Sequence, residues 1–291
     1  MKKFKTAVAA VAALATVITM SGCTAVGGNE PDERESEEIF APGDTIEPEL
    51  PVLPNEPAEE QPEEIPPAEE EPIIPETPKA KTVSYINVTS SGVNIRSGAG
   101  TNYSVKGVSE KSTMYAINGT SDGWYRTGYK NGTGYISSKY CKQVEMLASD
   151  DERIEAIIAE GCKLLGTAYV FGAVRYHDGN GNFLKNFTTS EFDCSSLMQY
   201  IFYIGAHVNL QVTTRTQIYQ GKTVTKSQLK RGDLMFFTNE TRKNNVGVER
   251  VGHVALYLGD NWILHTASDY AKIEQISALR WSYFIQGQRI F

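Results

Sequence analysis

The chain has 291 residues and a net charge of −7, but this charge is unevenly distributed. Between Glu30 and Pro78 there are 18 acidic residues and one basic residue, whereas the sequence after Pro78 carries an excess of seven basic residues. A positive excess favours an anionic partner, either a cell-wall polymer or a nucleic acid. The sequence contains no NAD-binding, nucleotide-binding or metal-binding motif, so we predict neither a cofactor nor a metal.

The N-terminus has the layout of an export signal. Three lysines precede an apolar stretch from Ala7 to Met20, which is too short to span a bilayer. The stretch ends in the sequence MSGC at Cys23, which resembles the lipobox of bacterial lipoproteins, where the cysteine is acylated. We therefore predict that residues 1–22 are an export signal and that Cys23 anchors the protein to the outer face of the cell membrane. An exported protein rarely meets nucleic acid, so the cell wall is the predicted anionic partner.

Residues 23–80 have the composition of a disordered tether. All 12 prolines of the chain lie between Pro31 and Pro78, mixed with glutamates, as in PAEEQPEEIPPAEEEP. Such a segment has too little apolar surface to offset the entropy of ordering the chain, and its charges repel one another. We expect an extended spacer that holds the rest of the protein away from the membrane.

Residues 81–145 are predicted to form a small all-β barrel. Short runs of Val, Ile, Tyr and Thr alternate with turn signals such as SDG and KNGTG. The sequences VNIRSG from Val93, GWY around Trp124 and GYI around Tyr135 resemble the bacterial SH3-like domain, which commonly binds peptidoglycan. A second interpretation remains open, in which Trp124 and the tyrosines are core residues and the barrel only positions its neighbour.

A helix is predicted after the barrel. Ser149 and Glu152 have the spacing of a capping box, and apolar residues recur at helical intervals from Ile154 to Leu165. Cys162 lies on this apolar stripe and is predicted to be a buried, unreactive residue. A disulfide between Cys141 and Cys162 is compatible with export, but the sequence does not establish it.

Residues 148–291 are predicted to form one α+β domain, with helices on one face of an antiparallel sheet. The apolar runs GDLMFF, GHVALYL and WILHTA are predicted strands, and a helix begins within EFDCSSLMQYIF. Asp193 is a suitable N-cap, which places Cys194 in the first helical turn. Unpaired N–H groups at a helix N-terminus favour a thiolate, so Cys194 is the candidate nucleophile.

Two of the four histidines lie in one predicted hairpin, HVALYLGDNWILHTA. His253 opens the first strand, Gly259-Asp260-Asn261 forms the turn, and His265 lies in the returning strand. If Leu258 pairs with Trp262, the two imidazoles are diagonal neighbours on one face of the sheet. The cysteine and both histidines would then supply a nucleophile, a base and a residue that orients the base.

The motifs of this domain closely resemble those of the NlpC/P60 family of cell-wall peptidases. The similar segments occur in the family's order: LGTAYVFGA, FDCSSLMQYIF, TTRTQIYQ, LKRGDLMFF, VGHVALYLGDNWILHTA and WSYFIQGQRIF. The resemblance implies a papain-like fold with a Cys-His-polar triad, in which Cys194 is the nucleophile, His253 the base and His265 the orienting residue. It also implies hydrolysis of the amide between γ-linked D-glutamate and the diamino acid of the peptidoglycan stem peptide, through an acyl-enzyme on the cysteine.

The resemblance also indicates substrate-binding residues. The backbone N–H of Cys194 and the hydroxyl of Tyr169 would stabilise the oxyanion. Asp193 and Ser195 flank the nucleophile, and in related enzymes the aspartate contacts the free amine of the stem peptide. The longest departure from the family pattern is Val174–Glu191, a loop predicted to lie near the cleft.

Within that loop we considered four side chains as substrate contacts, against the alternative of a surface loop that touches nothing: Arg175, Tyr176, His177 and Lys185. His177 and His207 are otherwise expected to be structural or exposed. A barrel aromatic such as Tyr85 or Trp124 could also select stem peptides with a free N-terminal alanine.

Two other functions remain compatible with the sequence. One is a wall-binding lipoprotein whose peptidase domain is inactive, and the other is a cysteine amidase or acyltransferase with a different substrate. We expect a monomer whose partners are stem peptides and the anionic wall.

Overall fold

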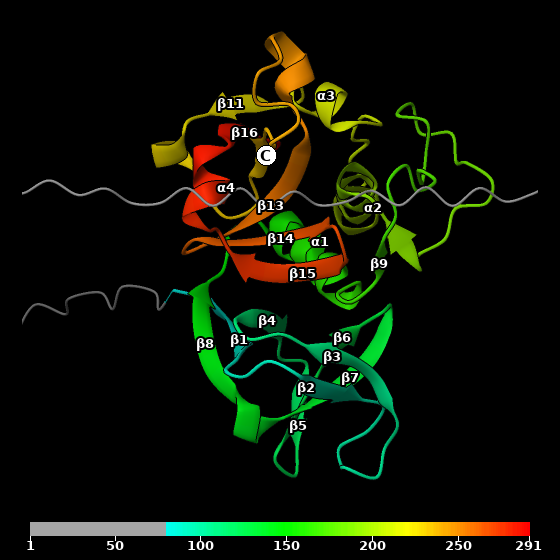
Figure 1. The fold of residues 1–291 in the computed structure, drawn as a ribbon, viewed down its shortest axis with the longest axis vertical. Helices are drawn as coiled ribbons and strands as arrows, with labels where there is room; N and C mark the ends of the chain where they lie inside the picture. The colour runs from blue at the N-terminus through cyan, green and yellow to red at the C-terminus, as the bar shows by residue number, and fades with distance from the viewer. Residues whose placement is uncertain (1–79) are drawn as a thin grey trace, which may run out of the picture. The chain divides into compact units, whose positions relative to one another are not determined.

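The computed structural model describes residues 80–291, so the predicted export signal, Cys23 and nearly all of the tether lie outside the described residues. No helix within residues 80–291 has the length and hydropathy needed to cross a membrane. The described chain contains a β-barrel followed by an α+β domain (Figure 1).

The barrel is built from eight short strands: β1 (Thr82–Val88), β2 (Val93–Arg96), β3 (Val105–Ser109), β4 (Thr113–Ala116), β5 (Gly119–Ser121), β6 (Trp124–Tyr129), β7 (Gly132–Ser137) and β8 (Cys141–Leu147). Five of them form a sheet in the order β3-β2-β7-β6-β5. Lys130 and Asn131 join β6 to β7 with φ angles of 50° and 53°, as the KNG signal predicts for a two-residue hairpin turn. Alternating side chains of the strands, among them Ile86, Ile95 and Ile136, form the barrel core.

The α+β domain contains four helices and eight strands: α1 (Glu152–Lys163), β9 (Ala168–Tyr169), β10 (Glu191–Phe192), α2 (Cys194–Ala206), α3 (Thr214–Gln217), β11 (Lys222–Val224), β12 (Leu234–Phe237), β13 (His253–Gly259), β14 (Trp262–Ala267), β15 (Tyr270–Gln275), α4 (Ala278–Ser282) and β16 (Phe284–Arg289). Helix α2 packs against α1 and against β13 and β14. Its buried face includes Leu197, Ile201 and Phe202. This arrangement confirms the predicted α+β class.

The start of α1 differs from the prediction. Asp151, rather than Ser149, is the N-cap, and its side chain accepts a hydrogen bond from the N–H of Arg153. Aspartate is among the strongest N-cap residues, so the helix starts at the later of the two signals. Cys162 is buried in α1, as predicted, and the thiols of Cys141 and Cys162 are both free, so no disulfide joins them.

The hairpin of β13 and β14 has the predicted register over most of its length. Leu256 pairs with Leu264, but next to the turn Gly259 pairs with Trp262 where Leu258 was expected. Asp260 and Asn261 have φ angles of 47° and 67°, so the turn has two residues and a bulge takes up the extra residue. The bulge affects only the turn, so the histidine positions further along the hairpin keep their predicted alignment.

One sheet runs from the α+β domain into the barrel, in the order β11-β16-β12-β13-β14-β15-β4-β1-β8. The connection is the pairing of β15 with β4, where Ile273 lies opposite Met114 and Glu274 opposite Thr113 (Figure 1). The sequence had indicated a separate barrel. Backbone pairing instead joins the two domains, which belong to one compact unit.

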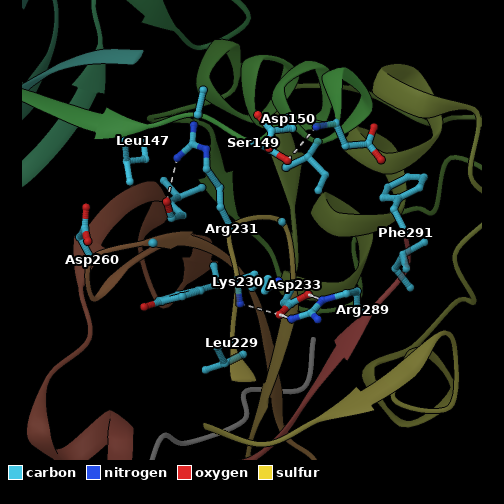
Figure 2. Close-up of a pocket in the computed structure, with 18 residues that line it drawn as sticks. Leu147, Ser149, Asp150, Leu229, Lys230, Arg231, Asp233, Asp260, Arg289 and Phe291 are labelled. Atoms are coloured by element: carbon cyan, nitrogen blue, oxygen red, sulfur yellow. Dashed lines mark hydrogen bonds and ion pairs between the residues drawn. The ribbon is translucent and has the colours of Figure 1, made fainter. Parts of the chain in front are cut away.

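Arg231 reinforces this junction. Its guanidinium binds both carboxylate oxygens of Glu155 at 2.6 and 2.8 Å, and it donates to the hydroxyl of Tyr85 in the barrel and to the carbonyl of Leu258. Figure 2 shows Arg231 among the residues that line a cavity of about 720 Å³ beside the junction. The Arg231 side chain is 7% exposed, so these partners have to compensate the cost of removing its charge from water.

Replacing Arg231 with alanine is expected to lower the free energy of unfolding by about 3–5 kcal/mol, because the substitution leaves the half-buried Glu155 carboxylate without its partner. Denaturant unfolding of the wild type and the variant measures this difference. Lys111→Ala is the control, since this exposed lysine makes no ion pair within residues 80–291. Equal stabilities for the Arg231 variant and the wild type would contradict the structural role of Arg231.

Candidate active site

Cys194 is the first residue of α2, and Asp193 is its N-cap, as predicted. The Asp193 carboxylate accepts a hydrogen bond from the N–H of Ser196 at 2.8 Å, and the Ser196 hydroxyl accepts one from the N–H of Asp193 at 2.9 Å. This capping box fixes the first turn of the helix. The Cys194 side chain is thereby held at the helix N-terminus, where it is 8% exposed.

The protonation state of Cys194 differs from the prediction. Burial, together with the negative charge of Asp193, raises the pKa of the thiol to about 12. The N–H groups of Val254 and Ser195 and the charge of Arg175 oppose this shift without reversing it. The resting side chain is therefore a neutral thiol, because desolvation outweighs the effect of the helix N-terminus. A base is needed when the sulfur attacks.

The structure brings the two predicted histidines together. His253 Nε2 lies 2.9 Å from His265 Nδ1, with the two rings nearly perpendicular at 80°. Burial is the main cause of a His253 pKa well below the usual value, and His265 and Arg280 lower it further. His253 is therefore neutral near pH 7 and able to accept a proton.

A residue that the sequence analysis missed completes this group. Glu274 in β15 accepts a hydrogen bond from His265, with 2.9 Å between His265 Nε2 and Glu274 Oε1, and Arg280 binds the same oxygen at 3.2 Å. Burial by itself would raise the pKa of Glu274, but the hydrogen bond from His265, the interaction with the His265 ring and the positive charges of Lys272 and Arg280 lower it to about 2. The apolar alternation in YAKIEQ indicates a strand in the sequence, but only the observed register, with Ile263 opposite Glu274, brings this carboxylate diagonal to His265.

The Glu274 carboxylate determines the tautomers of both histidines. An ionised carboxylate only accepts hydrogen bonds, so His265 Nε2 carries a proton and donates it. His265 Nδ1 then accepts from His253 Nε2–H, which leaves the lone pair of His253 Nδ1 available. This is the tautomer that can take a proton from a thiol.

Glu274→Gln is expected to lower kcat by about 10- to 100-fold, because an amide can donate as well as accept and no longer selects one tautomer of His265. The kinetics of hydrolysis across a pH series would measure the effect. Glu110→Gln, at an exposed position in the barrel, is the matched control. An unchanged kcat in Glu274→Gln would show that the carboxylate does not act on the histidine pair.

Two cavities share the lining residues Tyr169 and Gly252, and one of them is lined by Cys194 and the other by His253. The cavity of about 160 Å³ includes Cys194, Asp193 and Ser195, together with Arg175, Arg215 and Arg242. The cavity of about 320 Å³ includes His253, Asn239, Arg280 and Tyr283. A substrate crossing from one to the other would place its acyl part beside the thiol and its leaving amine beside the imidazole.

The larger cavity in Figure 2 is not part of this site. None of the candidate catalytic residues lines it, and its main charges are already paired, with Arg289 on Asp233 at 2.7 Å and Arg231 on Glu155. The chemistry is therefore assigned to the two smaller cavities.

Family comparisons agree with this geometry. The bacterial SH3 domain model matches residues 91–142, and the NlpC/P60 family model matches residues 166–289. Residues 166–289 form an NlpC/P60 domain. The two predicted domain types are thus confirmed.

Similar proteins match the NlpC/P60 part of the chain. The chain is 30% identical over 144 residues to the Peptidoglycan DL-endopeptidase CwlO of Bacillus licheniformis, covering 49% of this chain and 29% of that protein. It is 26% identical over 166 residues to the Gamma-DL-glutamyl hydrolase of Bacillus subtilis, covering 57% of this chain and 36% of that protein. The chain therefore spans about a third of the length of these curated relatives. The chain also aligns with the crystal structure of an NlpC/P60 family protein from Bacillus cereus. The alignment covers 72% of this chain and 63% of that chain, at 19% identity and a TM-score of 0.38.

The loop Val174–Glu191 of the NlpC/P60 domain brings one of its four candidate residues into the cleft. Arg175 lines the cavity of Cys194. Tyr176 packs among aromatic rings of the loop and of α2, and His177 is fully buried against Tyr203. Lys185 is exposed and does not line either cleft cavity.

The barrel aromatics do not enter the cleft. Tyr85 is 1% exposed and holds Arg231, so it has a structural role. Trp124 lines a separate cavity of about 780 Å³ formed by barrel residues. The suggestion that either residue selects substrates at the NlpC/P60 site was therefore wrong. No cluster of three or more His, Cys, Asp or Glu side chains suited to a metal ion occurs in the part of the chain that the structure describes.

Proposed function

We propose that the protein is a peptidoglycan hydrolase that cleaves an amide bond of the stem peptide, with Cys194 as its nucleophile. The observation that carries this proposal is the buried chain of hydrogen bonds from His253 through His265 to Glu274, in the same domain as a cysteine at a helix N-terminus. The names of the related endopeptidase and glutamyl hydrolase support the same substrate class.

The reaction begins with a neutral thiol and a neutral imidazole. As the sulfur attacks the carbonyl carbon, His253 Nδ1 takes the thiol proton. The positive charge that forms on His253 is stabilised through His265 by the Glu274 carboxylate. The N–H of Cys194 and the hydroxyl of Tyr169 donate to the oxyanion.

The tetrahedral intermediate then collapses. The carbon–nitrogen bond breaks, His253 returns its proton to the leaving amine, and a thioester remains on Cys194. Water attacks the thioester with His253 as the base, which releases the acyl product and restores the thiol. The cavity beside His253 receives the leaving amine, and the cavity beside Cys194 holds the acyl part.

The bond between γ-linked D-glutamate and the diamino acid fits these cavities. A γ-linked glutamate keeps its α-carboxylate free, close to the bond that is cleaved. Arg215 and Arg242 line the cavity of the acyl part and can bind that carboxylate. The relatives named as a DL-endopeptidase and as a Gamma-DL-glutamyl hydrolase support this choice of bond.

The N-terminal sequence supports a site of action outside the cell. Export by residues 1–22 and lipid attachment at Cys23 would hold the protein at the outer face of the membrane, facing the wall or periplasm. We expect it to act there as a monomer. Metabolic labelling with a radioactive fatty acid tests this placement, with Cys23→Ser as the control.

Mass spectrometry of muropeptides incubated with the full chain tests the proposed reaction. Cleavage after γ-D-Glu, which leaves L-Ala-γ-D-Glu joined to the disaccharide and releases the rest of the stem peptide, is the expected result. Products cut at another bond would assign a different amidase specificity. Uncleaved muropeptides would contradict the proposal and favour a wall-binding protein with an inactive peptidase domain.

A further inference from the structure

The carboxylate beside the nucleophile is already fully occupied by groups of the protein. One oxygen of Asp193 accepts from the Ser195 hydroxyl at 3.0 Å and the Ser196 N–H at 2.8 Å. The other accepts from the Gly172 N–H at 3.2 Å and pairs with Arg175 Nη2 at 2.8 Å. Two carboxylate oxygens offer about four acceptor positions, so none remains for a substrate.

Arg175 is held in this position from several sides. Its Nε donates to the carbonyl of Val212 at 2.8 Å, Nη1 donates to the carbonyl of Ala173, and Nη2 also contacts the Ser195 hydroxyl at 3.2 Å. The side chains of Arg175 and Asp193 are only 14% and 6% exposed. A buried, multiply bonded ion pair of this kind does not open without leaving Asp193 uncompensated.

The remaining charge of the cavity is positive. Arg215 and Arg242 line it, and their shared acidic partner Glu249 is loosely held, at 3.6 and 3.3 Å, with its side chain 60% exposed. A weak surface pair of this kind leaves the guanidinium groups available to a ligand. The cavity therefore favours a neutral or anionic acyl part and disfavours an ammonium group.

We propose that Arg175 makes the enzyme select stem peptides whose N-terminal alanine is amide-linked, as in peptide still attached to the glycan, over peptides with a free N-terminal amine. This inference rests on the proposed function. The guanidinium occupies the position at Asp193 that a substrate ammonium would need, and it repels that ammonium. An amide-linked alanine carries no such charge and enters the cavity without displacing Arg175.

The test compares two synthetic substrates with the full chain: the tripeptide L-Ala-γ-D-Glu-diaminopimelate and its N-acetylated form, repeated with lysine as the third residue. The wild type is expected to cleave the acetylated peptide with a kcat/KM about tenfold higher or more. Arg175→Ala frees one acceptor position on Asp193, so the ratio is expected to shift towards the free amine by at least about tenfold. Lys185→Gln removes a positive charge from the same loop outside the cavity, and its ratio should equal that of the wild type.

The outcomes separate this inference from the proposed function. Equal kcat/KM values for the two peptides in the wild type, or a preference for the free amine, would overturn the role of Arg175 while leaving the hydrolase intact. This comparison needs no variant, so it holds even where Arg175→Ala does not fold. Cleavage of neither peptide would overturn the proposed function and the inference together.

Discussion

Replacing Cys194 with alanine is expected to abolish cleavage of the stem peptide after γ-D-Glu, with kcat at least about 10⁴-fold below that of the wild type. The substitution removes the sulfur that forms the thioester, and a methyl group cannot attack a carbonyl carbon. The helix should persist, because its capping box is formed by Asp193 and Ser196. Quantitative mass spectrometry of muropeptide digests measures the loss.

Cys162→Ala is the matched control for this experiment. Cys162 is also a buried free thiol, but it lies in α1 and lines neither cleft cavity. Its replacement should preserve kcat, even where stability falls slightly. Equal rates of stem-peptide cleavage by Cys194→Ala and Cys162→Ala would rule out Cys194 as the nucleophile.

His253→Ala is expected to lower kcat/KM by at least about 10³-fold and to change its dependence on pH. The wild type needs neutral His253. Burial lowers the pKa of this group, so activity should be retained at pH 6 and lost only as the pH falls through the depressed value. Without His253, attack needs a preformed thiolate. Since the pKa of Cys194 is about 12, residual activity should rise about tenfold per pH unit between pH 7 and 10.

Rate measurements across this pH range distinguish the loss of a base from a general loss of structure. His207→Ala removes an exposed histidine at the C-terminus of α2 and is expected to keep the wild-type profile. A His253 variant whose residual rate is independent of pH would contradict the assignment of His253 as the base.

The sheet that joins the two domains gives the barrel a structural role near the chemistry. Thr113 of β4 pairs with Glu274 of β15, the residue that accepts the hydrogen bond of His265. The barrel therefore supports the strand that holds the carboxylate. Such a role is compatible with wall binding elsewhere on the barrel, for example at the cavity that includes Trp124.

Sequence patterns predicted the candidate catalytic group where local rules determine it. The N-cap preference of aspartate placed Cys194 in the first turn of a helix, and strand alternation across a short turn placed His253 next to His265. Both inferences depend only on residues close in sequence. The bulge at Leu258 was missed, because it depends on how Asp260 and Asn261 form the turn.

Features that depend on distant contacts were not predicted. Glu274 joins the histidines only because β15 pairs with β14, and Arg175 reaches Asp193 only because its loop folds back over α2. The raised pKa of Cys194 likewise reflects burial by the whole domain, which outweighs the local effect of the helix. Side-chain type and spacing do not specify these contacts.

The central claim is that the stem peptide is cleaved through a thioester on Cys194. Intact-protein mass spectrometry of the full chain, quenched with acid during turnover of muropeptides, tests it most directly. We expect a mass increase equal to the acyl part of the substrate, located by peptide mapping to the segment that contains Cys194 and absent from Cys194→Ala. Product release without any adduct in the wild type, or an adduct on another residue, would contradict the account.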